Sequence, residues 1–142
     1  MAAPNRLLLL AEDDAAIAMV YRLRLQMDGY EVVHASDGLE ALRLARQRLP
    51  DLVLLDIRLP KIDGFTVLER LKLDSRTAEV PVVVVSNALV GSARMDAALK
   101  LGALEWLIKS HTTPAQLSER VRYWLGSDAA EAGATARWRA TS

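Results

Sequence analysis

Short, continuous apolar runs recur along the chain, and four of them end directly before polar residues. Apolar runs of this length, bounded by turn residues, are typical of strands that are buried on both faces of a parallel sheet. In an open parallel sheet, ligands bind just beyond the carboxyl ends of the strands, so we expect these polar residues to gather at one edge. The runs and the polar residues that follow them are Leu7–Ala11 with Glu12 and Asp13, Leu52–Leu55 with Asp56, 82–85 with Ser86, and 107–108 with Lys109.

The segments between these runs have the periodicity of amphipathic helices. In the segment 39–48, the apolar positions recur every three or four residues up to Leu49, which is expected to face the core with them. Thr113 and Gln116 form a capping-box pattern with Pro114 at the first helical position. Five strands alternating with five helices predict a doubly wound α/β fold. The predicted strands are 7–11, 31–35, 52–55, 82–85 and 104–108, and the predicted helices are 14–27, 39–48, 65–73, 92–101 and 114–125.

The composition limits the class of protein. A chain of 142 residues with 51% hydrophobic content is expected to form one domain. Eighteen basic and eighteen acidic residues leave no net charge, so neither nucleic acid nor an anionic membrane is an expected partner. The apolar runs are far shorter than the ~20 residues that span a bilayer, and a cytoplasmic location is expected. Because the chain has no cysteine, disulfides and thiolate metal sites are excluded.

The polar residues at the predicted strand ends are of the kinds that phosphoryl transfer uses. Taken singly, each has an ordinary structural role: Asp13 suits a helix N-terminus, Ser86 a helix cap, and Lys109 a solvated surface position. Their joint occurrence at four strand ends outweighs those separate roles. Carboxylates, a hydroxyl and an ammonium gathered in one small site can hold a divalent cation and accept a phosphoryl group.

Four stretches around these residues closely resemble the receiver domain of two-component response regulators. They are 8–14 (LLLAEDD), 51–64 (DLVLLDIRLPKIDG), 85–87 (VSN) and 102–109 (GALEWLIK). The resemblance runs from about Arg6 to Leu125. It implies one receiver domain over 6–125, and leaves 126–142 as a tail or helix extension with no output domain. It also implies a flavodoxin-like sheet of five parallel strands in the order 2-1-3-4-5.

The resemblance implies a role for each residue at the edge of the sheet. Asp56 is expected to be phosphorylated by a histidine kinase or a histidine phosphotransfer protein. Lys109 would offset charge on the transferring group, and Ser86 would donate its hydroxyl to a phosphoryl oxygen. Mg²⁺ is the implied cofactor, since it is held by few carboxylates plus waters and phosphate oxygens. Its implied ligands are Asp13 and Asp56 directly, the carbonyl of Arg58, and Glu12 through water.

Three positions differ from the commonest receiver pattern. Ser110 follows Lys109 at a position where proline, in a cis peptide, is frequent. Asn87 replaces the usual small residue after Ser86. Trp106 occupies the position of the switch aromatic residue, which is more often Tyr or Phe. Plain core packing explains Trp106 as well as switching does.

The sequence favours one function and leaves alternatives open. The favoured one is a stand-alone phosphoacceptor receiver that catalyses its own phosphorylation and slow dephosphorylation and signals through protein contacts. The first alternative is a pseudo-receiver scaffold that binds its partner without phosphorylation, which Ser110 leaves open. A hydrolase of the aspartyl-phosphate type is disfavoured, because no second aspartate stands two residues after Asp56. The expected face for the downstream target comprises three segments: from Ser92 to Leu101, from Leu104 to Ile108, and from Pro114 to Leu125.

Overall fold

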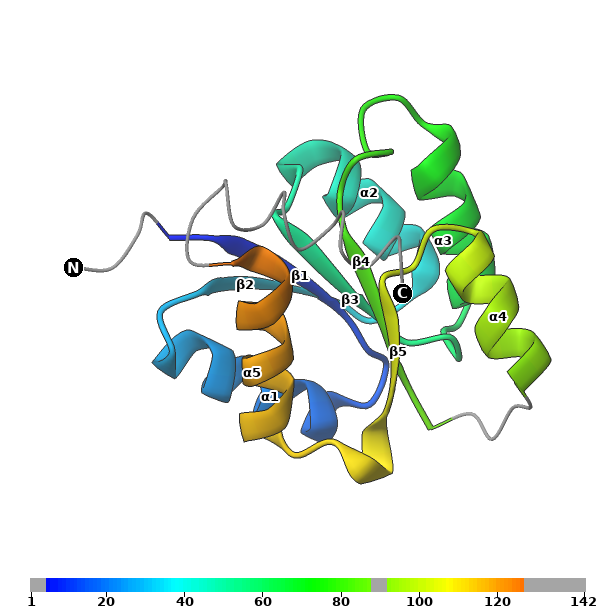
Figure 1. Cartoon of the computed structure of the whole chain (residues 1–142). Coiled ribbons are helices and arrows are strands. Elements are labelled where there is room, and N and C mark those ends of the chain that lie inside the picture. Colours follow the sequence, from blue (N-terminus) through cyan, green and yellow to red (C-terminus); the bar gives the residue numbers. More distant parts are fainter. Residues whose placement is uncertain (1–4, 88–91, 127–142) are drawn as a thin grey trace.

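The computed structural model describes residues 5–87 and 92–126. Within them, five parallel strands form one sheet in the order β2-β1-β3-β4-β5 (Figure 1). The strands are β1 Leu7–Ala11, β2 Glu31–Ala35, β3 Leu52–Leu55, β4 Val82–Ser86 and β5 Glu105–Ile108. The helices are α1 Ala15–Met27, α2 Gly38–Arg48, α3 Gly64–Leu73, α4 Ser92–Lys100 and α5 Pro114–Leu125, with a short 3₁₀ helix η1 Lys109–His111. The doubly wound fold and the strand order expected from the sequence are confirmed.

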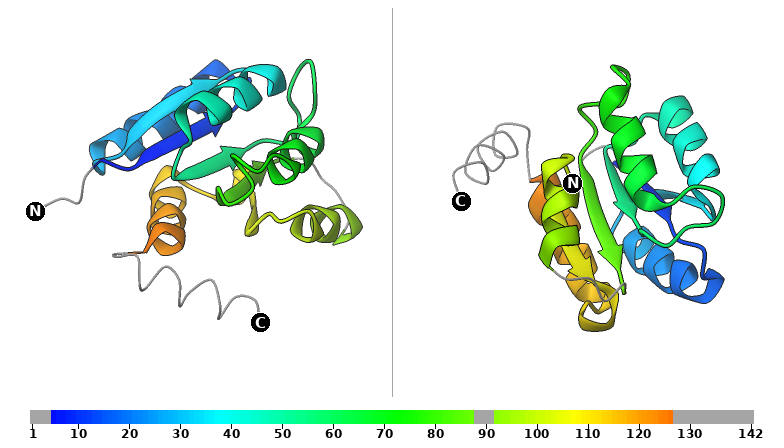
Figure 2. Two further views of the ribbon diagram at one scale, coloured as in Figure 1. Left: turned by 90° about the horizontal axis from the view of Figure 1, so that it is seen from above. Right: turned by 90° about the vertical axis from the view of Figure 1, so that its right-hand side faces the viewer.

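Helices cover both faces of the sheet. Helices α1 and α5 pack on one face, and α2, α3 and α4 pack on the other (Figures 1 and 2). Alternate residues of a strand point to opposite faces. Leu8 and Leu10 of β1 therefore pack in the core beneath α1 and α5, while Leu9 and Ala11 pack in the core beneath α2, α3 and α4. Burial on both faces explains why the strands read as unbroken apolar runs.

The register of the sheet brings the carboxyl ends of four strands to one edge. Ala11, the last residue of β1, lies opposite Ala35 of β2 and Leu55 of β3. Ser86 at the end of β4 lies opposite Ile108 at the end of β5. The polar residues that end or follow β1, β3, β4 and β5 therefore start from the same edge, as the sequence predicted.

Short polar side chains begin the helices. Asp14, Asp37 and Asp63 each precede a first helical residue and accept hydrogen bonds from backbone N–H groups of the first turn of α1, α2 and α3. Thr113 and Gln116 form the predicted capping box at α5. Several predicted bounds differ from the observed ones by one residue; at the start of α1, for example, the predicted first residue Asp14 is the capping residue.

One prediction about the core is wrong. Leu49 does not face the core: it is 53% exposed and is the C-cap of α2, with φ of 47°. A residue in the left-handed region no longer follows the helical period, so the pattern of α2 cannot place it. The segment 127–142, with Trp138, lies outside the described residues, and the expectation of a tail stays a prediction. No helix among the described residues is long and apolar enough to cross a membrane.

Candidate functional site

The polar residues that the sequence predicts to gather lie together at the edge formed by the carboxyl ends of the strands. Glu12 follows β1, Asp56 follows β3, and Lys109 follows β5. The carboxylates of Glu12 and Asp56 are buried, with 2% and 4% of each residue exposed. Asp13 is exposed beside them, and Ser86, the last residue of β4, is fully buried. The structure therefore brings acidic and basic groups from separate strand ends into one cluster.

Lys109 holds the centre of this cluster. Its Nζ lies 2.6 Å from Glu12 Oε1 and 2.7 Å from Asp56 Oδ2, and its side chain is only 9% exposed. Charge-assisted bonds of this length are among the stronger hydrogen bonds in proteins. Two buried carboxylates of like charge would repel one another, so the ammonium between them offsets an unfavourable arrangement.

Burial and pairing oppose one another at both groups, and the pKa of Glu12 and that of Lys109 each end above the usual value. Burial raises the pKa of Glu12 above its usual range, although hydrogen bonds from Lys109 and the Asp14 backbone oppose the rise. Burial alone would lower the pKa of Lys109, but its bonds to Asp56 and Glu12 outweigh burial and raise it. Lys109 is therefore a firmly charged cation at neutral pH, fixed beside a carboxylate that is costly to ionise.

The acidic residues have the donor set of a divalent-cation site. Carboxylate oxygens of Glu12, Asp13 and Asp56 lie within 4.8 Å of one another. Hard oxygen ligands from a few carboxylates are what Mg²⁺ takes in proteins, so the residues present fit this ion. The Arg58 N–H donates to Asp56 Oδ1 at 3.1 Å, which holds the Arg58 peptide against the cluster.

Backbone contacts that the sequence did not reveal fix the acids. Gly64 N–H donates to the Ile57 carbonyl at 2.8 Å. A Cβ at Gly64 would lie 2.3 Å from the Asp56 carbonyl oxygen, so only glycine allows α3 to begin this close to the loop after β3. His34 Nε2 donates to the Glu12 carbonyl at 2.7 Å, which ties β2 to the residue after β1. In the sequence, Gly64 appeared only as the last residue of the stretch 51–64.

Trp106 packs in the core on the α3 and α4 side. It lies opposite Val84 in the sheet, and its ring centroid is 6.2 Å from that of Phe65. Its Nε1 is a buried side-chain donor for which the described part of the chain provides no hydrogen-bond partner. Burying an indole N–H without a hydrogen-bond partner costs free energy, so this position of the Trp106 ring carries an energetic penalty.

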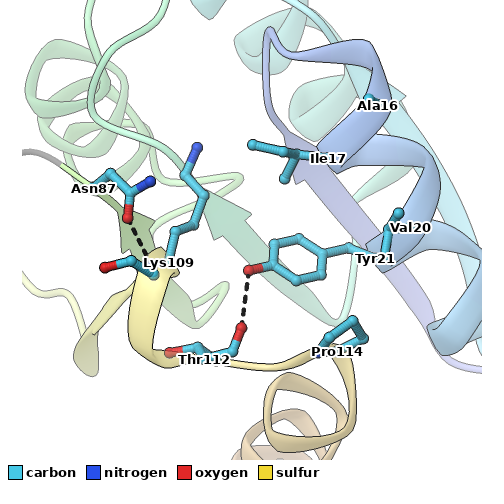
Figure 3. Close-up of a pocket in the computed structure, with 9 residues that line it drawn as sticks. Ala16, Ile17, Val20, Tyr21, Asn87, Lys109, Thr112 and Pro114 are labelled. Carbon is cyan, nitrogen blue, oxygen red and sulfur yellow. Dashed lines mark hydrogen bonds between the residues drawn. The ribbon is translucent and has the colours of Figure 1, made fainter.

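A pocket of about 300 Å³ lies beside the cluster, between α1 and the loop that leads into α5 (Figure 3). Ile17 and Tyr21 line one side, and Asn87 and Lys109 the other. The Tyr21 hydroxyl donates to the Thr112 carbonyl at 3.3 Å and closes one end. The sequence did not predict this pocket, because it depends on how α1 packs beside α5.

Comparison with known proteins agrees with this geometry. The model of the response regulator receiver domain matches residues 8–122. The protein named probable transcriptional regulator ycf27 of Guillardia theta is 41% identical over 114 residues, which are 80% of this chain and 43% of that protein. A CheY-like response regulator receiver domain protein of Methanospirillum hungatei is 27% identical with a TM-score of 0.78, covering 86% of this chain and 94% of the other.

A further solved structure bears on the acidic residues. The receiver domain of the sensor histidine kinase PA1611 of Pseudomonas aeruginosa was crystallised with a magnesium ion coordinated in its active-site cleft. It is 27% identical, with a TM-score of 0.78, and the match covers 87% of this chain and all of that one.

The curated relatives are longer than the region they share with this chain. The chain spans 33% of the regulator RpaA of Synechocystis and 43% of the Guillardia protein. The receiver-domain model, over residues 8–122, spans the five-stranded sheet and the acidic cluster. The chain therefore belongs to the response regulator receiver domain family of two-component signal transduction.

Proposed function

We propose that this chain is a phosphoacceptor: Asp56 takes a phosphoryl group from a phosphohistidine of a histidine kinase or phosphotransfer protein, and the modified domain signals through protein contacts. Receiver domains of this family interact with histidine kinases and with downstream targets. The observation that carries the proposal is the ion pair of Lys109 with both Glu12 and Asp56. The receiver would extend over residues 6–125.

The proposed transfer is an in-line displacement. An Asp56 carboxylate oxygen forms a bond to phosphorus while the bond from phosphorus to the donor imidazole nitrogen breaks, and the imidazole leaves with the electron pair. Lys109 neutralises charge on the phosphoryl oxygens, and the Ser86 hydroxyl donates to one of them. Water attacking the same phosphorus later releases phosphate and restores Asp56, so the modification limits itself.

The cation has a defined place in this proposal. Asp13 and Asp56 would ligate Mg²⁺ directly, with the Arg58 carbonyl as a further ligand and Glu12 acting through water. Bound there, the ion offsets negative charge on the phosphoryl oxygens. Lys109 then no longer has to balance both buried carboxylates, and its ammonium is available to the incoming phosphoryl group.

The direct test is chemical phosphorylation. We expect the wild-type chain, incubated with acetyl phosphate and Mg²⁺, to gain one phosphoryl group by intact-mass spectrometry, and to gain none when EDTA replaces Mg²⁺. A chain that gains none, while a receiver with known uptake is labelled in the same reaction, is not a phosphoacceptor. The pseudo-receiver scaffold, which binds its partner without this chemistry, would then be the better account.

Mg²⁺ is expected to stabilise the fold. An ion that binds only the folded protein adds about 2.7 kcal/mol at a concentration one hundredfold above its dissociation constant. Thermal unfolding with and without millimolar Mg²⁺ measures the gain as a rise in Tm. Asp13→Ala is expected to lose most of the rise, whereas Asp51→Ala, at the other end of β3, keeps it. Equal responses of the Asp13→Ala and wild-type proteins would contradict the ligand assignment.

The proposal extends to how the site is read out. Ser86 ends β4 and Trp106 lies on the adjacent strand, so a hydroxyl drawn toward a phosphoryl oxygen vacates space that the aromatic ring can enter. The surface of α4, β5 and α5, proposed above for the target, would change shape with it. Within residues 5–87 and 92–126, Trp106 Nε1 has no hydrogen-bond partner, which supports a second position for this ring.

Tryptophan fluorescence measures this movement. In a chain with Trp124→Phe and Trp138→Phe, beryllofluoride with Mg²⁺ is expected to shift the emission of Trp106 to shorter wavelength, because the ring moves inward. Mg²⁺ alone serves as the control. Unchanged emission from a chain that mass spectrometry shows to accept a phosphoryl group would make Trp106 a packing residue only.

A further inference from the structure

The turn that carries Lys109 begins with an N–H group that the turn itself cannot satisfy. Lys109 is the first residue of the 3₁₀ helix η1, and Ser110 is the second. The first N–H groups of any helix point away from its own carbonyls and need an outside acceptor. The Ser110 N–H has one, because it donates to Asn87 Oδ1 at 2.7 Å. The acceptor comes from the end of a different strand.

This bond continues the sheet past its last backbone pair. Ser86 and Ile108 are the final partners of the β4–β5 ladder. Beyond them, the Asn87 side chain accepts a hydrogen bond from the Ser110 backbone, in place of a further backbone hydrogen bond between β4 and β5. Figure 3 shows Asn87 and Lys109 together on one side of the pocket, with a hydrogen bond between Asn87 and the backbone beside Lys109. The end of β4 and the start of the turn are thus tied together.

Residues 87 and 110, which both differ from the commonest receiver pattern, are explained together by this bond. A proline at position 110 would have no N–H and would disfavour a helical conformation of Lys109 before it. A serine permits the helical turn but leaves an N–H that needs an acceptor. Asn87 supplies that acceptor. The asparagine after Ser86 and the serine after Lys109 therefore act together as a hydrogen-bonded pair.

The hydrogen bond between Asn87 and Ser110 affects where the Lys109 ammonium lies. On its far side the turn is closed by the Thr112 N–H, which donates to the Lys109 carbonyl at 3.1 Å, and by the Thr112 hydroxyl, which donates to the Ile108 carbonyl at 2.8 Å. Those bonds are local to the turn. The bond from Asn87 relates the turn to β4, and so to the cluster at the edge of the sheet. The backbone position of Lys109 sets the point from which its side chain reaches Glu12 and Asp56.

We propose that Asn87 is a positioning residue for Lys109, which holds the Lys109 ammonium between Glu12 and Asp56 by fixing the turn that begins at Lys109. The role of this ammonium in phosphorylation rests on the proposed function. The placement of Lys109 itself does not, and it can be measured without any phosphoryl donor.

Acylation of lysine by an N-hydroxysuccinimide ester of acetate, read by peptide mass spectrometry, reports this placement. In the wild type, Lys109 is expected to react far more slowly than Lys61, whose side chain is 61% exposed. Loss of one hydrogen bond in Asn87→Ala is expected to raise the Lys109 rate about three- to tenfold relative to Lys61. Asn87→Asp keeps an acceptor oxygen and is expected to restore protection. Ser110→Ala keeps the N–H and is expected to match the wild type.

The same variants are then phosphorylated with acetyl phosphate and Mg²⁺. Asn87→Ala is expected to slow the initial rate about three- to tenfold, in step with its Lys109 acylation. For Asn87→Ala, a lowered Tm with unchanged Lys109 acylation would reduce Asn87 to a stabilising residue and overturn the inference. Failure of Asn87→Asp to keep Lys109 protected would overturn it as well. A wild type that shows protected Lys109 but no phosphorylation would refute the proposed function while leaving the placement of Lys109 by Asn87 in force.

Discussion

Asp56→Asn is expected to reduce phosphoryl uptake from acetyl phosphate by about a thousandfold or more, which leaves no labelled chain on the timescale of the wild-type reaction. Asparagine has nearly the shape of aspartate, but its amide is not a nucleophile toward phosphorus and carries no charge to pair with Lys109. Intact-mass spectrometry at matched times measures the loss directly. Because Asp56 is buried between Lys109 and the Arg58 N–H, the substitution changes chemistry more than shape.

Asp51→Asn is the matched control for this result. Asp51 precedes β3 at its amino end, whereas Asp56 follows β3 at its carboxyl end. An asparagine oxygen at position 51 can still accept the Leu7 N–H, which Asp51 Oδ2 accepts at 2.8 Å. We expect its uptake to equal that of the wild type. Labelling of Asp56→Asn at the wild-type rate would place the phosphoryl group on another residue and refute the assignment.

The sequence predicted the fold well because its signals are local and mutually consistent. The buried strands are unbroken apolar runs. Four of the helices begin directly after Asp14, Asp37, Asp63 and Thr113, each of which caps a first turn with its own side chain. Strand ends in a parallel sheet share an edge by geometry, so the gathering of Glu12, Asp56 and Lys109 followed from the topology.

What the sequence could not show depends on backbone conformation or on contacts between distant segments. Leu49 fits the apolar period of α2, but its left-handed backbone turns it into solvent. The requirement for glycine at position 64 comes from the approach of α3 to the Asp56 carbonyl, which no local pattern encodes. Asn87 and Ser110 stood out in the sequence as two unrelated departures. Only the structure joins them by a hydrogen bond.

The ammonium of Lys109 is expected to be a large contributor to stability when Mg²⁺ is absent. Lys109→Met keeps most of the apolar stem but removes the cation, and so leaves the buried carboxylates of Glu12 and Asp56 without their partner. Breaking a buried pair in this way costs about 3 kcal/mol of unfolding free energy at neutral pH. Urea unfolding in EDTA measures it as a lower midpoint with an unchanged m-value. Lys61→Met, which loses only an exposed pair with Asp37, is expected to leave the midpoint nearly unchanged.

The dependence on pH and on Mg²⁺ identifies the cause of this loss. The pKa of Lys109 is raised in the folded state, so its stabilisation is complete below its ordinary value of 10.5 and is lost as the pH rises through the folded value. In Lys109→Met, the penalty comes from buried carboxylate charge without its partner, and burial raises the pKa of Glu12 in the folded state above its ordinary value. The penalty therefore shrinks as the pH falls toward the ordinary value of 4.5 for Glu12, where protonation removes the unpaired charge. Millimolar Mg²⁺ at neutral pH is expected to recover most of the loss, because a divalent cation replaces the missing ammonium. A deficit that neither acid nor Mg²⁺ reduces would show that Lys109 stabilises the fold by packing rather than by charge.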